Sequence, residues 1–392
     1  MRLRIAFLFP VSFVGGAELS MLEAISRLDK NKYDPLLMLP AKGPLEELSR
    51  SYDLESLILP WPKSILSASR NSGFVDALRV ARDFLSFSSQ LQKTLQQQNS
   101  DLLHANGFKA DIAAMLHAHM RRDPRVILHL RDILSGKRRT LFRLLSKGCP
   151  AQLIANSGST AAAAGWTKRC HVIYNGIDTD HYSPSTDRSS LRGRLGIGAE
   201  EFCIIAAGHI APLKGYDILI RSLPTLLRSL PDAHVHIFGK SNYGGFMDHE
   251  RELHKLARER DVSDAITWHG QVDDLLPWYQ AADLAVQPSR SEGFGRSAAE
   301  AGACALAAIV SDTGGLREVV SDGETGRRIS VEDPESLSEA MLRLALNPDE
   351  RRRMGVNARQ RIAELFSVTS QKDALEKLYD KFPPREAHGS SS

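Results

Sequence analysis

The feature that most constrains this chain is a repeated alternation between short apolar runs and longer amphipathic segments. The first run, Leu3 to Phe9, is compact and apolar, which is typical of a strand buried on both faces of a parallel sheet. The pair Gly15–Gly16 follows it, and then a segment whose Leu22 and Leu28 fall on one helical face. Strand, glycine turn and helix open a βαβ unit, although a plain tight turn would explain the two glycines equally well.

The alternation runs through one half of the chain and then restarts in the other. The runs that we expect to form strands are 3–9, 33–39, 54–59, 101–105, 125–130, 152–156 and 171–174 in the first half, and 202–207, 234–238, 266–269, the run before Pro288, 307–311 and a strand after Gly326 in the second. A length of 392 residues also favours two domains. We therefore predict an α/β protein of two doubly wound domains with a cleft between them.

The boundary between the two domains is expected in a polar, proline-containing segment that reads as a linker. The first domain would span 1–182 and the second 183–382, with the option that the last helix packs back on the first domain. Residues 383–392 are expected to form a disordered tail, because EAHGSSS offers no apolar side chain large enough to bury.

Bulk composition excludes several classes of protein. Hydrophobic residues make up 42% and charged residues 25% of the chain, as in an ordinary globular protein, and the formal charge of +3 gives no argument for nucleic acid as a partner. The basic start and apolar run of the first residues resemble a signal peptide, but proline and glycines interrupt the run and no cleavage site follows. With no apolar stretch of about twenty residues, we expect that nothing spans a membrane. Cysteines without a metal or disulfide pattern fit a cytoplasmic protein.

Basic side chains cluster in the first half of the chain. The clusters are Arg121–Arg122, Lys137–Arg138–Arg139, and Arg143 with Lys147. They fit either a solvated face or a surface that lies against anionic lipid headgroups on the inner face of the plasma membrane. The cysteines give no such signal, since Cys149, Cys170, Cys203 and Cys304 are far apart and match no metal spacing. We expect reduced thiols and no metal site.

The stretch Ser289 to Glu300, SRSEGFGRSAAE, combines two carboxylates with a glycine loop at a helix start. It follows an apolar run, so Glu292 would lie in a loop and Glu300 one and a half turns into the helix. The free N–H groups of a helix start attract anions, and carboxylates accept hydrogen bonds from sugar hydroxyls. The stretch therefore fits a site for a phosphorylated sugar, or a plain surface helix with a solvated Glu.

Other polar residues follow predicted strands, where the carboxyl ends of a parallel sheet line the ligand crevice. Lys214 lies in a glycine-bounded loop and can act as a point charge on a phosphate. His129, Arg131 and Asp132 end a strand of the first half and are candidates for substrate contact. The alternative is that Arg131 and Asp132 only pair with each other.

Several motifs occur in one order along nearly the whole chain. They are GGAE at 15–18, ANS at 155–157, VIYNGID at 172–178, the loop ending in KG at 208–215, PSRSEGFGRSAAEA at 288–301, DTGGLREVV at 312–320 and DGETG at 322–326. By these motifs the chain resembles the retaining glycosyltransferases of family 4, also called group 1, with the GT-B fold of two Rossmann-like domains facing across a cleft. EGFG and the two glutamates separated by seven residues are the most specific part.

The resemblance implies a role for each candidate residue. The second domain would bind a UDP- or GDP-linked sugar, with Glu300 on the ribose hydroxyls, Glu292 on the sugar, and the backbone of Gly293, Phe294 and Gly295 close to sugar and phosphate. Lys214 and His209 would lie on the diphosphate, and Gly16 would let the first helix of the other domain point at it. Arg131 would act near the acceptor, a glycan or a lipid-linked glycan in bacterial surface polysaccharide synthesis. Such enzymes need no metal and no cofactor beyond the donor.

The chain departs from the family pattern at three places. His209 stands where members usually have Arg, Arg131 where many have His, and Ala305 and Ala307 where Gly and Pro are usual. The first two put the phosphate-side cation and the near-acceptor role in doubt, while for the alanines we expect only a structural effect. Two other functions remain as alternatives: a GT-B-fold phosphorylase or nucleotide-sugar epimerase, and a non-catalytic nucleotide-sugar-binding protein.

Overall fold

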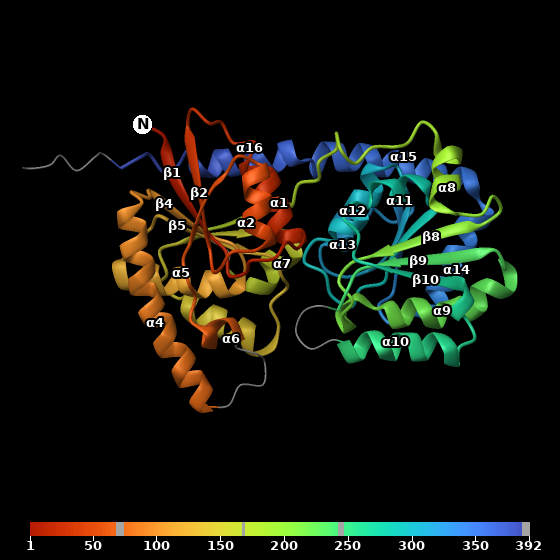
Figure 1. Cartoon of the computed structure of the whole chain (residues 1–392), viewed down its shortest axis with the longest axis horizontal. Coiled ribbons are helices and arrows are strands. Elements are labelled where there is room, and N and C mark those ends of the chain that lie inside the picture. Colours follow the sequence, from red (N-terminus) through yellow and green to blue (C-terminus); the bar gives the residue numbers. More distant parts are fainter. Residues whose placement is uncertain (68–73, 167–168, 242–246, 386–392) are drawn as a thin grey trace, which may run out of the picture. The chain divides into compact units, whose positions relative to one another are not determined.

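The computed structural model describes residues 1–67, 74–166, 169–241 and 247–385, which divide into two compact units (Figure 1). The first unit comprises Met1–Gly176 together with Val368–Ser392, and the second comprises Ile177–Ser367. Each unit is a parallel sheet covered by helices on both faces. The predicted α/β class with two Rossmann-like, doubly wound domains is therefore confirmed.

The first unit contains a seven-stranded sheet in the order β3-β2-β1-β4-β5-β6-β7. Its strands are β1 (Leu3–Leu8), β2 (Tyr33–Leu39), β3 (Glu55–Ile58), β4 (Leu102–Ala105), β5 (Val126–Leu130), β6 (Gln152–Ala155) and β7 (Cys170–Val172). Its helices are α1 (Gly16–Ile25), α2 (Pro44–Ser51), α3 (Lys63–Ser67), α4 (Phe74–Gln97), α5 (Phe108–Arg121), α6 (Gly136–Ser146), α7 (Gly158–Ala164) and α16 (Val368–Tyr379). The strand order reverses between β1 and β4, which is where such sheets bind ligands.

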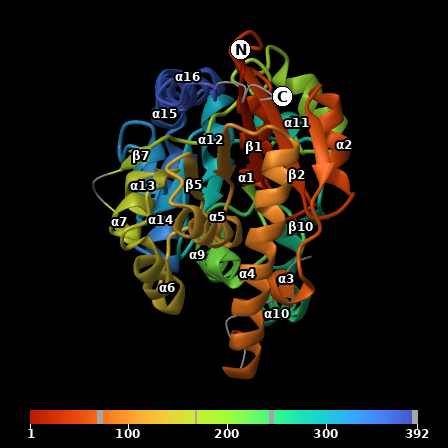
Figure 2. The same cartoon turned by 90° about the vertical axis from the view of Figure 1, so that its left-hand side faces the viewer.

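Alternate side chains of β1 explain why this strand reads as a continuous apolar run. Ile5 and Phe7 pack into one core with residues of α1 and α16, whereas Ala6 and Leu8 pack into the other core with residues of α4 and α5. Figure 2 shows α4 and α5 side by side on their face of the sheet. Because both faces are covered, these four positions are apolar. The one charged residue of the strand, Arg4, lies near its start and pairs with Asp34 and Glu55.

The second unit contains a six-stranded sheet in the order β10-β9-β8-β11-β12-β13. Its strands are β8 (Phe202–Ala207), β9 (Ala233–Phe238), β10 (Ile266–Gly270), β11 (Leu284–Gln287), β12 (Ala308–Ser311) and β13 (Gly326–Ile329). Its helices are α8 (Arg188–Leu195), α9 (Tyr216–Ser229), α10 (Met247–Glu259), α11 (Leu276–Ala281), α12 (Arg296–Ala303), α13 (Leu316–Val319), α14 (Pro334–Leu346) and α15 (Pro348–Leu365). Here the strand order reverses between β8 and β11.

The division between the units differs from the predicted boundary at residue 182. Tyr182 is buried and its ring contacts the ring of Tyr279 edge-on within the second unit. The expected linker also ends in α8, whose first turn is capped by the Asp187 side chain, which accepts from the N–H of Ser190. The segment contains a proline and is rich in serine and aspartate, and such a composition is typical of a linker. Composition alone does not show that Tyr182 is buried or that Asp187 caps a helix.

The last helix, α16, belongs to the first unit and lies against α1 (Figure 1). The Tyr379 hydroxyl lies 2.7 Å from Nδ1 of His104 on β4, and Nε2 of His104 lies 3.0 Å from Nδ1 of His129 on β5. Burial holds the pKa of both imidazoles well below its usual range, so both rings are neutral. The neutral chain of hydrogen bonds fixes α16 to the sheet without burying a charge.

The predicted tail lies mostly outside the described residues, but its start is attached. The backbone N–H of Arg385 donates to Asp101, and Arg125 donates to the carbonyl of Pro383. The expectation of disorder therefore fails for residues 383–385. Over the described parts of the chain, no helix is both long enough and apolar enough to cross a bilayer.

Ala305, one of the two alanines that depart from the family pattern, has an unusual backbone conformation. It has φ +58°, in the left-handed region that favours glycine, and a Cβ on Gly355 would meet its carbonyl oxygen at 2.0 Å. The chain thus holds an alanine in a conformation that costs about 1 kcal/mol relative to the right-handed one.

Candidate functional site

The candidate residues of the second unit lie on two loops at the carboxyl ends of β8 and β11, where the strand order reverses. The loop after β8 carries Lys214 at the end of a short 3-10 helix, Pro212–Lys214, and the loop after β11 carries Glu292. The turn after β12 supports the second loop, since the N–H of Gly315 donates to the carbonyl of Glu292. The topology therefore brings together residues that are 78 positions apart in the sequence.

Lys214 and Glu292 form an ion pair in which Lys214 Nζ lies 2.5 Å from Glu292 Oε2. The same oxygen accepts from Nε2 of Gln287, the last residue of β11, at 2.9 Å. Gln287 Oε1 in turn accepts from the backbone N–H of Ala298 in α12. One amide side chain therefore fixes the Glu292 carboxylate relative to the start of the helix. Sequence analysis missed Gln287, because a glutamine at a strand end has no pattern of its own.

Two glycines allow the loops to approach each other closely. Gly215 has φ +69°, and a Cβ built there would lie 2.0 Å from the carbonyl oxygen of Pro288. Gly295 has φ +102°, and a Cβ there would lie 2.4 Å from the Leu316 side chain. Both positions require glycine for its conformation and for its missing side chain. The ion pair between Lys214 and Glu292 depends on this close contact.

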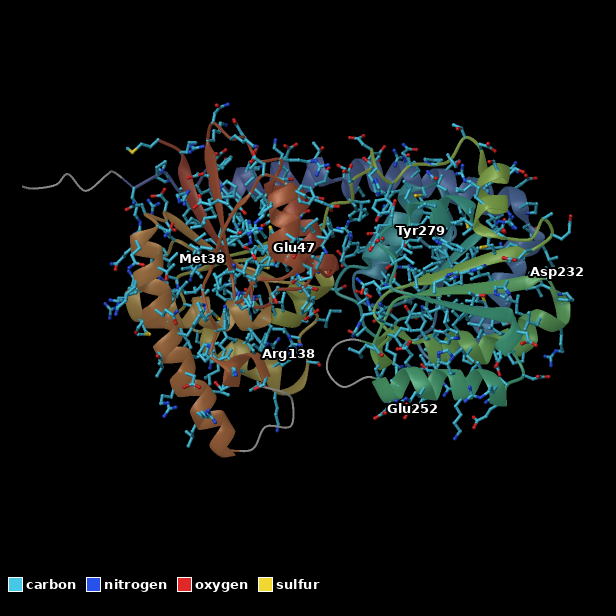
Figure 3. All side chains as sticks on the ribbon, viewed as in Figure 1. Met38, Glu47, Arg138, Asp232, Glu252 and Tyr279 are labelled. Atoms are coloured by element: carbon cyan, nitrogen blue, oxygen red, sulfur yellow. The ribbon has the colours of Figure 1, made fainter. Side chains whose placement is uncertain are left out.

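Glu300 is buried on α12, with its carboxylate held by two neighbours. Arg296 Nε lies 2.6 Å from Glu300 Oε1, and the Tyr279 hydroxyl donates to Oε2 at 3.3 Å. Figure 3 labels Tyr279, which comes from α11. Burial raises the pKa of Tyr279 well above its usual range, with the Glu300 charge adding to it, so the phenol stays protonated and donates. Glu300, which is predicted to bind the ribose hydroxyls, is thus oriented by Arg296 and Tyr279. The sequence alone did not point to either of these two residues.

Arg290 braces the two loops from the exposed side. Its guanidinium donates to both carboxylate oxygens of Asp217 in α9, at 2.7 and 2.9 Å, and to the carbonyl of Pro212. It also pairs with Glu332. Arg290, the second residue of the SRSEGFG motif, therefore has a partner for each edge of its guanidinium, and it holds the Lys214 loop against the Glu292 loop.

The remaining donor-site candidates of the second unit are Phe294, Gly293 and His209, and they differ in which of their atoms a ligand could contact. The ring of Phe294 is buried and contacts Phe366 edge-on, so only its backbone can contact a ligand. Gly293 packs its carbonyl against Gly315. His209 is the second residue after β8 and is half-buried in the loop that carries Lys214. All of the predicted donor-binding residues except Gly16 thus lie on the loops after β8 and β11 or on α12.

Gly16 and Arg131 belong to the first unit, again at the carboxyl edge of its sheet. Gly16 begins α1, and Glu18 in the first turn of that helix accepts from the N–H of Gly15. Arg131 is buried and donates to the side-chain oxygens of Asn106 and Asn175, at 2.7 and 2.6 Å. Burial lowers the pKa of Arg131 to about 10, opposed by the charge of Glu18, so the guanidinium remains charged at neutral pH.

At the strand end that carries Arg131, the structure excludes one candidate residue and one alternative. Arg131 does not pair with Asp132, whose ion-pair partner is Arg138 at 3.5 Å. His129 is fully buried and bonded to His104, so it does not reach a substrate. The alternation of a strand decides this, because His129 points into the core that α16 covers. The sequence suggested that His129 contacts a substrate, because imidazole is a common ligand group and the residue lies near a strand end. The buried contact with His104 rules out that role.

Comparisons with known proteins agree with this geometry. The pattern of the family described as Glycosyl transferases group 1 matches residues 187–361, and that of Glycosyltransferase Family 4 matches residues 14–181. A D-inositol 3-phosphate glycosyltransferase of Streptomyces bingchenggensis is 34% identical over 48% of this chain and 42% of its own length. The lipopolysaccharide core biosynthesis mannosyltransferase LpsB of Rhizobium meliloti is 28% identical over 67% of this chain and 78% of its own length.

A solved structure extends the likeness to the whole fold. Anabaena HepE, crystallised in complex with UDP and glucose, aligns with 97% of this chain and 100% of its own, with a TM-score of 0.81 at 24% identity. That likeness shows the GT-B fold. The chain spans about half the length of the first curated relatives that it matches, 42% and 52% for two of them.

Proposed function

Because the chain belongs to the group 1 glycosyltransferases, with the GT-B fold, we propose that it transfers a sugar from a nucleotide-diphospho-sugar to an acceptor with retention of the anomeric configuration. The observation that carries this proposal is the Lys214–Glu292–Gln287 arrangement at the start of α12. It presents a cation, a fixed carboxylate and a helix N-terminus within one loop pair. A diphosphate needs the first and third of these groups, and a sugar needs the second.

In the proposed reaction, the ion pair between Lys214 and Glu292 is exchanged for contacts of both side chains with the donor. When a diphosphate arrives, Lys214 Nζ exchanges the Glu292 carboxylate for phosphate oxygens. Glu292, still held by Gln287, then accepts from sugar hydroxyls. Glu300 would bind the ribose hydroxyls, and His209 and the backbone of Gly295 would lie along the diphosphate. As the bond to the anomeric carbon breaks, Lys214 stabilises the departing diphosphate. None of these steps requires a metal ion.

The first unit supplies the acceptor side of the proposed reaction. By the family resemblance, Gly16 at the start of α1 would bring a helix N-terminus that attracts the diphosphate, and Arg131 would act near the acceptor. The names of the relatives, a lipopolysaccharide core mannosyltransferase and inositol phosphate glycosyltransferases, support a glycan or phosphorylated acceptor in bacterial surface polysaccharide synthesis. HepE in complex with UDP-glucose supports a UDP-sugar as the first donor to test.

Donor binding should raise the unfolding temperature of the protein, because a ligand that binds only the folded state stabilises it by mass action. We expect UDP, GDP or ADP with its matching sugar to give a rise of about 5 °C at a concentration of about 100 times Kd, and the other nucleotides to give less. Thermal unfolding across the nucleotide panel measures this. A flat response to the whole panel, with the protein folded, would contradict the proposal.

Turnover then separates transfer from the other functions. Nuclear magnetic resonance of the product should show the anomeric configuration of the donor, and donor should persist when the acceptor is withheld. Conversion of the donor sugar without acceptor would indicate an epimerase. Tight donor binding with no product over a panel of glycan acceptors would indicate a binding protein.

We also propose that α6 contacts an anionic membrane surface from the cytoplasmic side. Leu141 and Leu144 are 42% and 62% exposed on this helix, and Lys137, Arg139 and Lys147 are exposed beside them. An exposed apolar pair rimmed by basic side chains fits a bilayer of anionic lipids.

Flotation with phosphatidylglycerol vesicles should carry the protein upward, whereas phosphatidylcholine vesicles should not. A Lys137→Glu/Arg139→Glu variant is expected to lose at least half of the floated fraction, because each basic residue near the surface contributes about 1 kcal/mol. Lys255→Glu/Arg258→Glu, on α10 of the second unit, serves as the matched change of charge, since both residues are exposed. Equal flotation of both variants, or a wild-type protein that stays at the bottom, would contradict the membrane contact.

A further inference from the structure

We propose that the second unit holds a divalent transition-metal site, of the class that takes Zn²⁺ or Co²⁺, formed by Glu201, Cys203 and His236. The three residues come from the residue before β8, from β8 itself and from β9. One ligand atom from each, a carboxylate oxygen, a sulfur and an imidazole nitrogen, lies within 4.8 Å of the other two. Sulfur, imidazole and carboxylate together are the donor set that these borderline metals prefer.

The contacts of His236 leave one ring nitrogen for the metal and one for an outer partner. Nε2 lies 3.0 Å from Glu201 Oε1, and Nδ1 lies 2.9 Å from Nε2 of His269 on β10. Without a metal, His236 donates from Nε2 to Glu201 and accepts at Nδ1 from His269. With a metal on Nε2, the ring donates from Nδ1 to His269, as metal-bound histidines do to an outer acceptor.

The groups around the three residues fit a tightly bound ion, because they close one side of the site and allow its charge to be balanced. The ring of His236 stacks on His269 and contacts Trp278 at 5.1 Å, so that side of the site is closed by aromatic groups. Burial raises the pKa of Cys203 to about 12, with the charges of Glu201 and Asp283 adding to it. A bound dication would displace the thiol proton, and one thiolate with one carboxylate would balance its charge. The neutral complex avoids the cost of a buried net charge.

A cavity of about 720 Å³ reaches the site at Glu201, which is part of its wall, whereas Cys203 and His236 lie behind that wall. The wall also carries Glu200, Asp232, Asp261 and Asp264, and its described lining residues include no lysine or arginine. Figure 3 labels Asp232, just before β9. Acidic groups around a cavity raise the local concentration of cations. The Glu201 side chain is 20% exposed and that of His236 is 8% exposed, so Glu201 is the ligand nearer to solvent.

This site is separate from the donor site, because the two lie at opposite ends of β8. Cys203 is near the amino end of the strand, whereas the loop with Lys214 follows its carboxyl end. A metal at the amino end would clip β8 to β9 and stabilise the sheet. It would take no part in sugar transfer.

Cobalt is the probe that tests the proposal, since a cobalt–thiolate bond absorbs in the near ultraviolet. Full-length protein without a histidine tag, stripped with a chelator, should bind one equivalent of Co²⁺ with this absorption, and Zn²⁺ should displace it. Cys203→Ser should lose the absorption, and Glu201→Gln should weaken Co²⁺ binding at least about 10-fold. Cys304→Ser, which changes another buried cysteine of the same unit, should leave the spectrum unchanged.

Further measurements on these variants show whether a lost cobalt signal comes from loss of the metal site or from unfolding of the protein. Zn²⁺ should raise the unfolding temperature of the wild type and of Cys304→Ser by about 5 °C, and not that of Cys203→Ser. Nucleotide binding at the other end of the sheet reports that each variant is folded. If Cys203→Ser fails to fold, the Glu201→Gln variant, which changes a partly exposed side chain, decides. The proposal is overturned if wild type shows no thiolate absorption or if folded Cys203→Ser retains it.

Discussion

Replacing Lys214 by Ala is expected to lower the rate of sugar transfer about 10²–10³-fold, a loss of about 3–4 kcal/mol of transition-state stabilisation. Lys214 Nζ is the cation that faces Glu292 at 2.5 Å, and in the proposed reaction it exchanges this partner for the leaving diphosphate. Negative charge on the diphosphate grows as the glycosidic bond breaks, so the loss should fall mainly on kcat rather than on KM. Steady-state kinetics with the donor found in the nucleotide panel measures both constants.

Glu292→Ala should give a loss of the same order, since it removes the carboxylate that Gln287 fixes beside the sugar. The double variant should lose little more than either single variant, because the two residues act in one step. Lys255→Ala is the control: it removes an exposed lysine that pairs with Glu259 at 3.5 Å on α10. Transfer near the wild-type rate in folded Lys214→Ala and Glu292→Ala would refute the assignment of the site.

Replacing Gly215 by Ala is expected to destabilise the second unit by about 3 kcal/mol and to reduce transfer. The added Cβ would lie 2.0 Å from the carbonyl oxygen of Pro288, a backbone atom that cannot rotate away. The positive φ of +69° adds about 1 kcal/mol for any residue with a side chain. Relief of the clash must separate the Lys214 loop from the Glu292 loop, which lengthens the ion pair. Thermal unfolding should show a fall of about 6–12 °C.

Gly196 provides a matched control, because it has nearly the same φ, +73°, but nothing within 4 Å of an added Cβ. Gly196→Ala should therefore cost only the conformational term, about 1 kcal/mol, and leave transfer unchanged. The difference between the two variants isolates the close approach of the loops. Equal destabilisation by both would show that the contact with Pro288 relaxes without cost.

The arrangement of the fold was predictable because its strands are buried on both faces. Runs such as Leu3 to Phe9 and Phe202 to Ala207 stand out against the amphipathic segments, and the structure places β1 and β8 there. Helices without a strong apolar stripe were harder. The segment that forms α6 was noted only for its basic residues, because Phe142 is its only buried side chain.

The residues of the site were predictable where the chemistry is local. Glu292, Gly295 and Glu300 lie within one strand–loop–helix unit, so their spacing alone indicated their place. Their supports come from elsewhere: Tyr279 is 21 positions from Glu300, and Asp217 is 73 positions from Arg290. Pairs of this kind depend on which strands become neighbours. The cluster of Glu201, Cys203 and His236 escaped notice for the same reason, since no spacing along the chain relates a residue of β8 to one of β9.

The return of α16 to the first unit has a consequence for how the protein is made. The ribosome synthesises residues 1–176 first, but the hydrogen-bond partner of His104 is Tyr379, which is synthesised 275 positions later. Until then, the core around Phe7 stays open on the side that Leu375 and Leu378 later cover. The second unit, contiguous from Ile177 to Ser367, can complete its core before the first. A stop codon shortly after residue 367 would therefore damage the part synthesised earliest and spare the part synthesised later.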